Sequence, residues 1–71
     1  MANMTEMQAK VKKFIAGFRA KHGFSPTIRE LSEHFRMNVF GIQRHLLALE
    51  KKGHIHRTAN TARSIVVVER R

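Results

Sequence analysis

The apolar residues of this chain repeat with a helical period over three stretches and then change to the period of a strand. This order limits the fold more than any other feature. The spacing predicts three helices, over about residues 5–22, 28–34 and 39–52. The β-branched run 64–68 predicts a strand, and Ile55, between two histidines, marks an earlier one, with a small polar loop over 58–62 between them. We therefore expect a mainly α-helical fold that ends in a two-stranded hairpin.

Two capping boxes support the first two predicted helices. Thr5 precedes Gln8 by three residues, and Thr27 precedes Glu30 by the same distance. In each pair the hydroxyl can accept from an early backbone N–H, while the longer side chain reaches back to the N–H of the threonine. Gly23 is expected to end the first helix, because glycine suits the left-handed conformation of a helix C-cap.

Size and charge limit the classes of protein to consider. A chain of 71 residues predicts one domain, spanning residues 1–71. Its 14 Lys and Arg exceed its five Asp and Glu, for a net charge of +9. Such an excess indicates an anionic partner, with nucleic acid ahead of a membrane surface. The sequence has no uninterrupted run of the about 20 apolar residues that a membrane span needs, and it has no secretory leader. We therefore expect a cytoplasmic protein without a membrane partner.

The sequence gives little support to catalysis or to a bound metal. Its five carboxylates are scattered, and it has neither a nucleophile motif nor a glycine loop that would hold phosphates. Its five histidines are accompanied by no cysteine and no clustered carboxylate, so a metal site would be incomplete. We expect no enzyme activity, no metal and no cofactor.

Residues 31–46, LSEHFRMNVFGIQRHL, have the spacing of a helix-turn-helix. That motif needs a small residue in its first helix, a turn residue four positions later and a branched apolar residue six beyond, here Ser32, Arg36 and Ile42. Arg36 departs from the pattern, because the turn residue often has a positive φ, which glycine adopts without strain. With the hairpin as a wing, these parts predict a winged helix-turn-helix.

Three segments resemble the DNA-binding domain of the LexA repressor family. Residues 45–57, HLLALEKKGHIHR, resemble its H-L-x-x-L-E-x-K-G-x-I-x-R run. Residues 23–31, GFSPTIREL, are similar to its G-x-x-P-[ST]-x-R-E-I segment, and 63–67, RSIVV, to its final R-x-I-x-V strand. The resemblance covers residues 5–68. It implies a transcriptional regulator, and specifically a repressor, that binds double-stranded DNA sequence-specifically.

Two departures limit what the resemblance implies. The chain is one residue shorter than the family pattern between Phe35 and Ile42, where the recognition helix begins. It also stops where LexA continues into a self-cleaving, dimerising domain. The operator sequence and the Ser–Lys autoproteolysis are therefore not carried over. We expect monomers that pair weakly on DNA, since symmetric operators bind paired readers.

A helix-turn-helix places the N-terminal half of its second helix in the major groove. Among the outward residues there, Gln43 suits adenine, Arg44 suits guanine and Phe40 can touch a thymine methyl group. The residues predicted to contact bases are Asn38, Phe40, Gly41, Gln43 and Arg44. Phosphate contacts are predicted at the start of the second helix, at the end of the third and on the wing, by Ser25, Thr27, Arg29, Lys52, Arg57 and Arg63.

A second interpretation stays open, in which the chain is a protein-interaction module that modulates another transcription regulator. An aromatic residue beside a glycine on the reading helix, Phe40 and Gly41, supports this interpretation, and Val66 and Val68 could supply an apolar contact. RNA binding is a weaker third option, because the sequence suggests no aromatic stacking platform.

Overall fold

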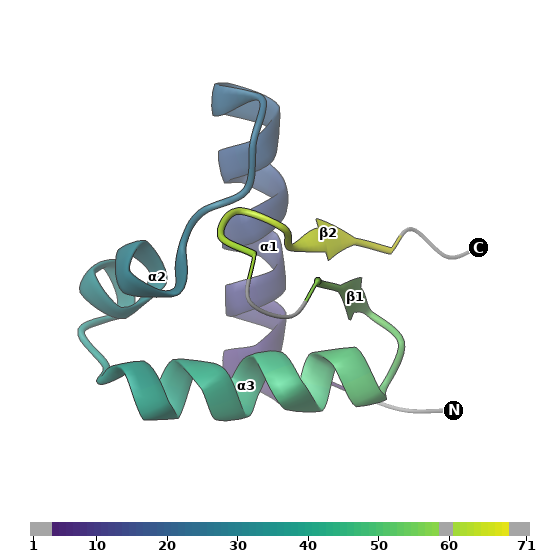
Figure 1. Cartoon of the computed structure of the whole chain (residues 1–71). Helices are drawn as coiled ribbons and strands as arrows, with labels where there is room; N and C mark the ends of the chain where they lie inside the picture. Colours follow the sequence, from purple (N-terminus) through teal and green to yellow (C-terminus); the bar gives the residue numbers. More distant parts are fainter. Residues whose placement is uncertain (1–3, 59–60, 69–71) are drawn as a thin grey trace.

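A computed structural model describes residues 4–58 and 61–68 of the chain. Its elements are α1 (Glu6–His22), α2 (Ile28–Phe35), α3 (Val39–Lys51), β1 (Ile55–His56) and β2 (Val66–Val67). In Figure 1, α1 stands behind the other elements and α3 runs across its lower end. α3 contacts α1, α2 and β1. The order and arrangement confirm the predicted winged helix-turn-helix.

Both capping boxes are present, and they explain where α1 and α2 begin. Thr5 Oγ1 accepts from Gln8 N at 3.1 Å, and Gln8 Oε1 accepts from Thr5 N at 3.1 Å. The hydroxyl of Thr27 accepts from Glu30 N at 3.1 Å, and the Glu30 carboxylate accepts from Thr27 N at 2.8 Å. Gly23 ends α1 with a φ of 81°, as predicted. The predicted helix ends lie within one residue of the observed ends.

The core lies where the three helices and the hairpin meet. Among residues 4–58 and 61–68, the buried hydrophobic core cluster has eight members: Val11, Ile15, Leu31, Ile42, Leu46, Leu49, Ile55 and Ile65. The helical members of this group follow the predicted apolar stripes. Burying one such side chain contributes about 1.5–3 kcal/mol. Because three of the eight lie on α3, one face of that helix is fixed in the core and its opposite face is directed outward.

The turn between α2 and α3 has the conformation that the motif requires. Arg36 is left-handed, with φ 55° and ψ 43°, and its N–H donates to the carbonyl of Ser32. Met37 N donates to the same carbonyl at 3.1 Å. Asn38 then begins α3, since its side-chain oxygen accepts from Gly41 N at 2.8 Å. The turn position, which glycine suits best, therefore holds an arginine in the left-handed conformation. This conformation costs a non-glycine residue about 1–2 kcal/mol.

The wing strands are shorter than the sequence predicts. β1 and β2 pair antiparallel with Ile55 opposite Val67 and His56 opposite Val66. Val68 N also donates to the carbonyl of His54, at 2.8 Å. The predicted strand over 64–68 is reduced to two residues, in part because Ile65 N donates to the hydroxyl of Ser25. The predicted loop over 58–62 includes residues 59 and 60, which lie outside the described residues. No helix in the described ranges is long and apolar enough to cross a membrane.

Candidate nucleic-acid interface

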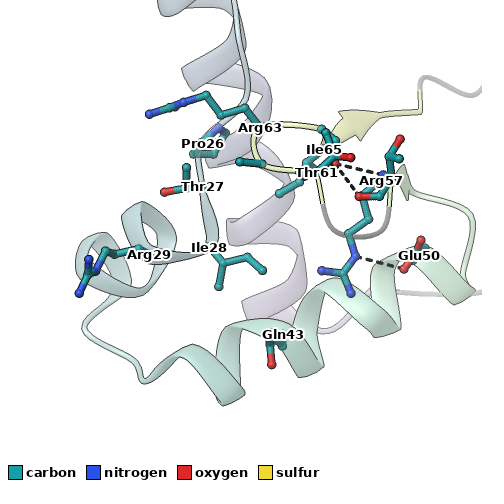
Figure 2. Close-up of a pocket in the computed structure, with 13 residues that line it drawn as sticks. Pro26, Thr27, Ile28, Arg29, Gln43, Glu50, Arg57, Thr61, Arg63 and Ile65 are labelled. Atoms are coloured by element: carbon teal, nitrogen blue, oxygen red, sulfur yellow. Dashed lines mark hydrogen bonds and ion pairs between the residues drawn. The ribbon is translucent and has the colours of Figure 1, made fainter.

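A groove of about 630 Å³ lies between the start of α2, one side of α3 and the wing. Figure 2 shows residues from all three elements around it. The predicted site residues that line it are Thr27, Arg29, Gln43, Arg57 and Arg63. The structure therefore brings together side chains that are up to 36 positions apart in the sequence.

Glu50 lies in the wall of this groove, and Glu30 adjoins it through Arg63. Arg63, on the wing, contacts α2 and the segment before it in three ways. Its Nη1 donates to Glu30 Oε1 at 3.0 Å and its Nη2 to Glu30 Oε2 at 3.2 Å, a two-pronged ion pair. Nη1 also donates to the Ser25 carbonyl at 3.1 Å, and the guanidinium lies 4.6 Å from the centre of the Phe24 ring. These contacts hold the wing against the start of α2.

The Glu30 carboxylate has a lowered pKa in this arrangement. The largest cause is the hydrogen bond from the backbone N–H of Thr27, and the second is the side-chain hydrogen bond from Arg63. Both contacts favour the charged form of the carboxylate. Folding therefore favours the ionised form of Glu30, which connects the capping box of α2 to the wing.

Arg57 makes the second contact between the wing and a helix. Its Nε donates to Glu50 Oε1 on α3 at 3.3 Å, as the dashed line in Figure 2 shows. Two of the arginines in the groove, Arg57 and Arg63, are thus paired with carboxylates, while Arg29 is exposed at the rim. These paired arginines remain partly exposed on the surface. The groove can offer cationic hydrogen-bond donors to an anion without a large local excess of positive charge.

The structure corrects the expectation for Ser25. Its side chain is fully buried, and its hydroxyl accepts from the backbone N–H of Ile65 at 3.2 Å. A phosphate cannot reach that oxygen in this conformation. Ser25 instead connects the segment before α2 to the wing, which the sequence alone did not distinguish from a ligand-binding role.

Lys52 also lies away from the predicted interface. It is half-buried, and its Nζ donates to Gln8 Oε1 on α1 at 2.8 Å. It is not among the residues that line the groove. The structure shows Lys52 joining the end of α3 to α1, and the phosphate contact at Lys52 stays a prediction. The exposed neighbour Lys51 follows the outward face of α3 and was not predicted as a site residue.

The predicted base-contacting residues lie at the beginning of α3. Phe40 is 75% exposed, and Asn38, Gln43 and Arg44 are exposed as well. Gly41 is half-buried, and a Cβ there would lie 3.1 Å from the end of the Met37 side chain. The oxygen of the Asn38 side chain caps α3, which leaves both N–H groups of the side-chain amide for a base contact.

Sequence reasoning missed three polar residues of the wing that line the groove, Thr58, Thr61 and Ser64. Ser64 Oγ accepts from Thr58 N at 3.0 Å and lies 2.9 Å from the Thr61 carbonyl, to which it can donate. Their one signal was the small, polar composition of the loop. In the described part of the chain, no three His, Cys, Asp or Glu side chains come together as metal ligands would.

Comparison with known proteins shows the family of the chain. Residues 1–64 match the model of the LexA DNA-binding domain. The LexA repressor of Thermosipho melanesiensis is 43% identical over 70 residues, and LexA repressor 1 of Geobacter sulfurreducens is 41% identical over 71. Each alignment covers 99% of this chain and 35% of the relative, so the chain spans about a third of the length of these relatives. The chain belongs to the LexA DNA-binding domain family.

Proposed function

We propose that this chain binds double-stranded DNA sequence-specifically and acts as a transcriptional repressor. The observation that carries the proposal is the outward face of α3. Ile42, Leu46 and Leu49 fix the opposite face in the core, so Gln43 and Arg44 project from a rigid support. The matched relatives are named repressors, and they extend well beyond the segment that this chain matches.

The proposed complex has the outward face of α3 lying along the major groove of the duplex. That groove is about 12 Å wide and accepts a helix. Gln43 would pair with adenine and Arg44 with guanine through two hydrogen bonds each. The DNA backbone would then follow the groove between α2 and the wing, where Thr27, Arg29 and the wing arginines are exposed or half-buried. Phosphate contacts of this kind set the position of the helix, and base contacts supply the specificity.

Replacing Arg44 with alanine tests this arrangement. We expect Arg44→Ala to lose about 1–3 kcal/mol of discrimination at one base pair, because a two-pronged contact to guanine is lost. The measurement is the affinity for a bound duplex and for its single-base variants at fixed salt. Arg19→Ala is the matched control, since Arg19 is exposed on α1 and does not line the groove. Equal base preferences in the two variants would contradict the proposal.

Paired binding completes the proposal. Two copies that occupy a symmetric operator would each place one α3 in the major groove, about one helical turn apart. We propose that the monomers associate weakly and that DNA brings them together. A second candidate, in which the chain modulates another regulator, is not favoured, because the matched relatives are named repressors. Capture of a regulator from lysate without any duplex binding would support that candidate instead.

A further inference from the structure

The outward face of α3 carries two large apolar side chains that the core does not use. Phe40 is 75% exposed and Leu47 is 52% exposed, whereas Ile42, Leu46 and Leu49 are fully buried on the other face. Leu47 lies seven positions after Phe40. With 3.6 residues per turn, the two side chains leave the helix in nearly the same direction. They therefore form one exposed stripe.

Cationic residues follow the same stripe. Arg44 lies four positions after Phe40, and Lys51 lies four positions after Leu47, so each cation is on the helix face of its apolar neighbour. Both cations are exposed. A surface on which apolar and cationic groups alternate is complementary to an anionic partner that also presents small apolar groups. The major groove of a duplex fits this description, because each thymine presents a 5-methyl group there between two phosphate backbones.

We propose that Phe40 and Leu47 contact the 5-methyl groups of two pyrimidines in the major groove. This inference rests on the proposed function and extends it, because it assigns Leu47 as a specificity-determining residue. Seven residues of helix span about 10 Å, at 1.5 Å per residue. Successive base pairs are about 3.4 Å apart, so the two methyl groups lie about three base pairs from one another. The preferred site therefore has a methylated pyrimidine at each of these positions.

Removing single methyl groups from the DNA tests the inference. A bound site is first selected from a random duplex pool, and each thymine in it is then replaced by deoxyuridine, which lacks only the 5-methyl group. We expect two replacements, about three base pairs apart, to weaken binding about three- to fivefold each, the effect of exposing one buried methyl group. A second arm compares cytosine with 5-methylcytosine at the same positions. A gain on methylation there identifies 5-methylcytosine as a further source of the same group.

Two protein variants assign each methyl group to its side chain. The duplex affinity of Phe40→Ala should no longer depend on deoxyuridine at one position, and that of Leu47→Ala should no longer depend on it at the other. Both side chains are exposed, so neither variant should lower the unfolding midpoint, which is measured in parallel. Sensitivity that is unchanged in both variants would overturn the inference. A second outcome would also overturn it. If the variants change the self-association of the chain, measured by sedimentation, but not its response to deoxyuridine, the stripe is a protein contact.

The result also separates this inference from the function on which it rests. If the selected pool contains no preferred duplex, the proposed function fails, and the inference fails with it. If the chain binds a preferred duplex but every deoxyuridine replacement leaves the affinity unchanged, only the methyl contacts are overturned.

Discussion

Arg36 and Arg63 have nearly the same positive φ in two different loops, 55° and 57°. Arg36 ends α2 in the turn before α3, where the backbone conformation itself is needed to direct α3 across α2. Arg63 lies on the wing, where its side chain binds Glu30 and the Ser25 carbonyl and covers the Phe24 ring. The comparison shows that a strained residue can be retained for its backbone in one loop and for its side chain in the other.

The largest effect is expected beneath Arg63, at Ser25. Ser25→Ala would leave the Ile65 N–H without its hydroxyl partner in a buried position, at a cost of about 1–3 kcal/mol. Urea unfolding measures this change in the free energy of unfolding. Ser64→Ala is the matched control, because the Ser64 hydroxyl bonds within the wing loop at exposed positions. If Ser25→Ala lowers the free energy of unfolding no more than Ser64→Ala does, the view that buried polar contacts hold the wing is contradicted.

Glycine substitutions at the two arginines should have effects of opposite sign. Arg36→Gly relieves the left-handed strain, partly offset by the greater freedom of glycine in the unfolded chain, so a gain of up to about 1 kcal/mol is expected. Arg63→Gly relieves similar strain but removes the ion pair and the Phe24 contact, so a loss of about 1 kcal/mol is expected. Thermal and urea unfolding of the two variants provide the measurement. Changes of the same sign would remove the distinction between the loops.

The smallest expected effect is the pH dependence at Glu30. Because the pKa of Glu30 is lowered by folding, its contribution to stability is present above its ordinary pKa near 4.5 and is lost as the pH falls through the folded pKa. Glu30→Gln should therefore be less stable than the parent at neutral pH, with a difference that narrows in acid. Urea unfolding from pH 7 down to pH 3 tests this. Glu33→Gln, at an exposed position of the same helix, is the control. A difference that widens in acid would contradict the assignment.

Much of the fold could be predicted because its signals are local. Thr5 and Thr27 each begin a helix through a side chain three residues away, and Gly23 ends one through its own backbone. The wing could be predicted only in outline. A β-branched run indicates a strand, but the partner of each N–H depends on distant residues. The N–H of Ile65 finds Ser25, 40 positions earlier in the sequence.

The site could be predicted less completely than the fold, for a related reason. A serine beside a proline and a lysine at a helix end have the same chemistry whether they bind a phosphate or another part of the chain. Only the packing shows that Ser25 is buried and that Lys52 binds Gln8 of α1. The outward face of α3 could be predicted, because the apolar period that buries one side of a helix also identifies the other.

The pairing of Arg57 and Arg63 with glutamates has a consequence for the salt dependence of the proposed DNA complex. A phosphate that approaches either arginine meets a cation whose charge is already shared with a carboxylate. The phosphate is then only partly neutralised, so fewer condensed counterions leave the DNA. A fully neutralised phosphate contributes a slope of about 0.9 to the dependence of log affinity on log salt concentration. A complex held through these two arginines would therefore tolerate ionic strength better than their number alone suggests.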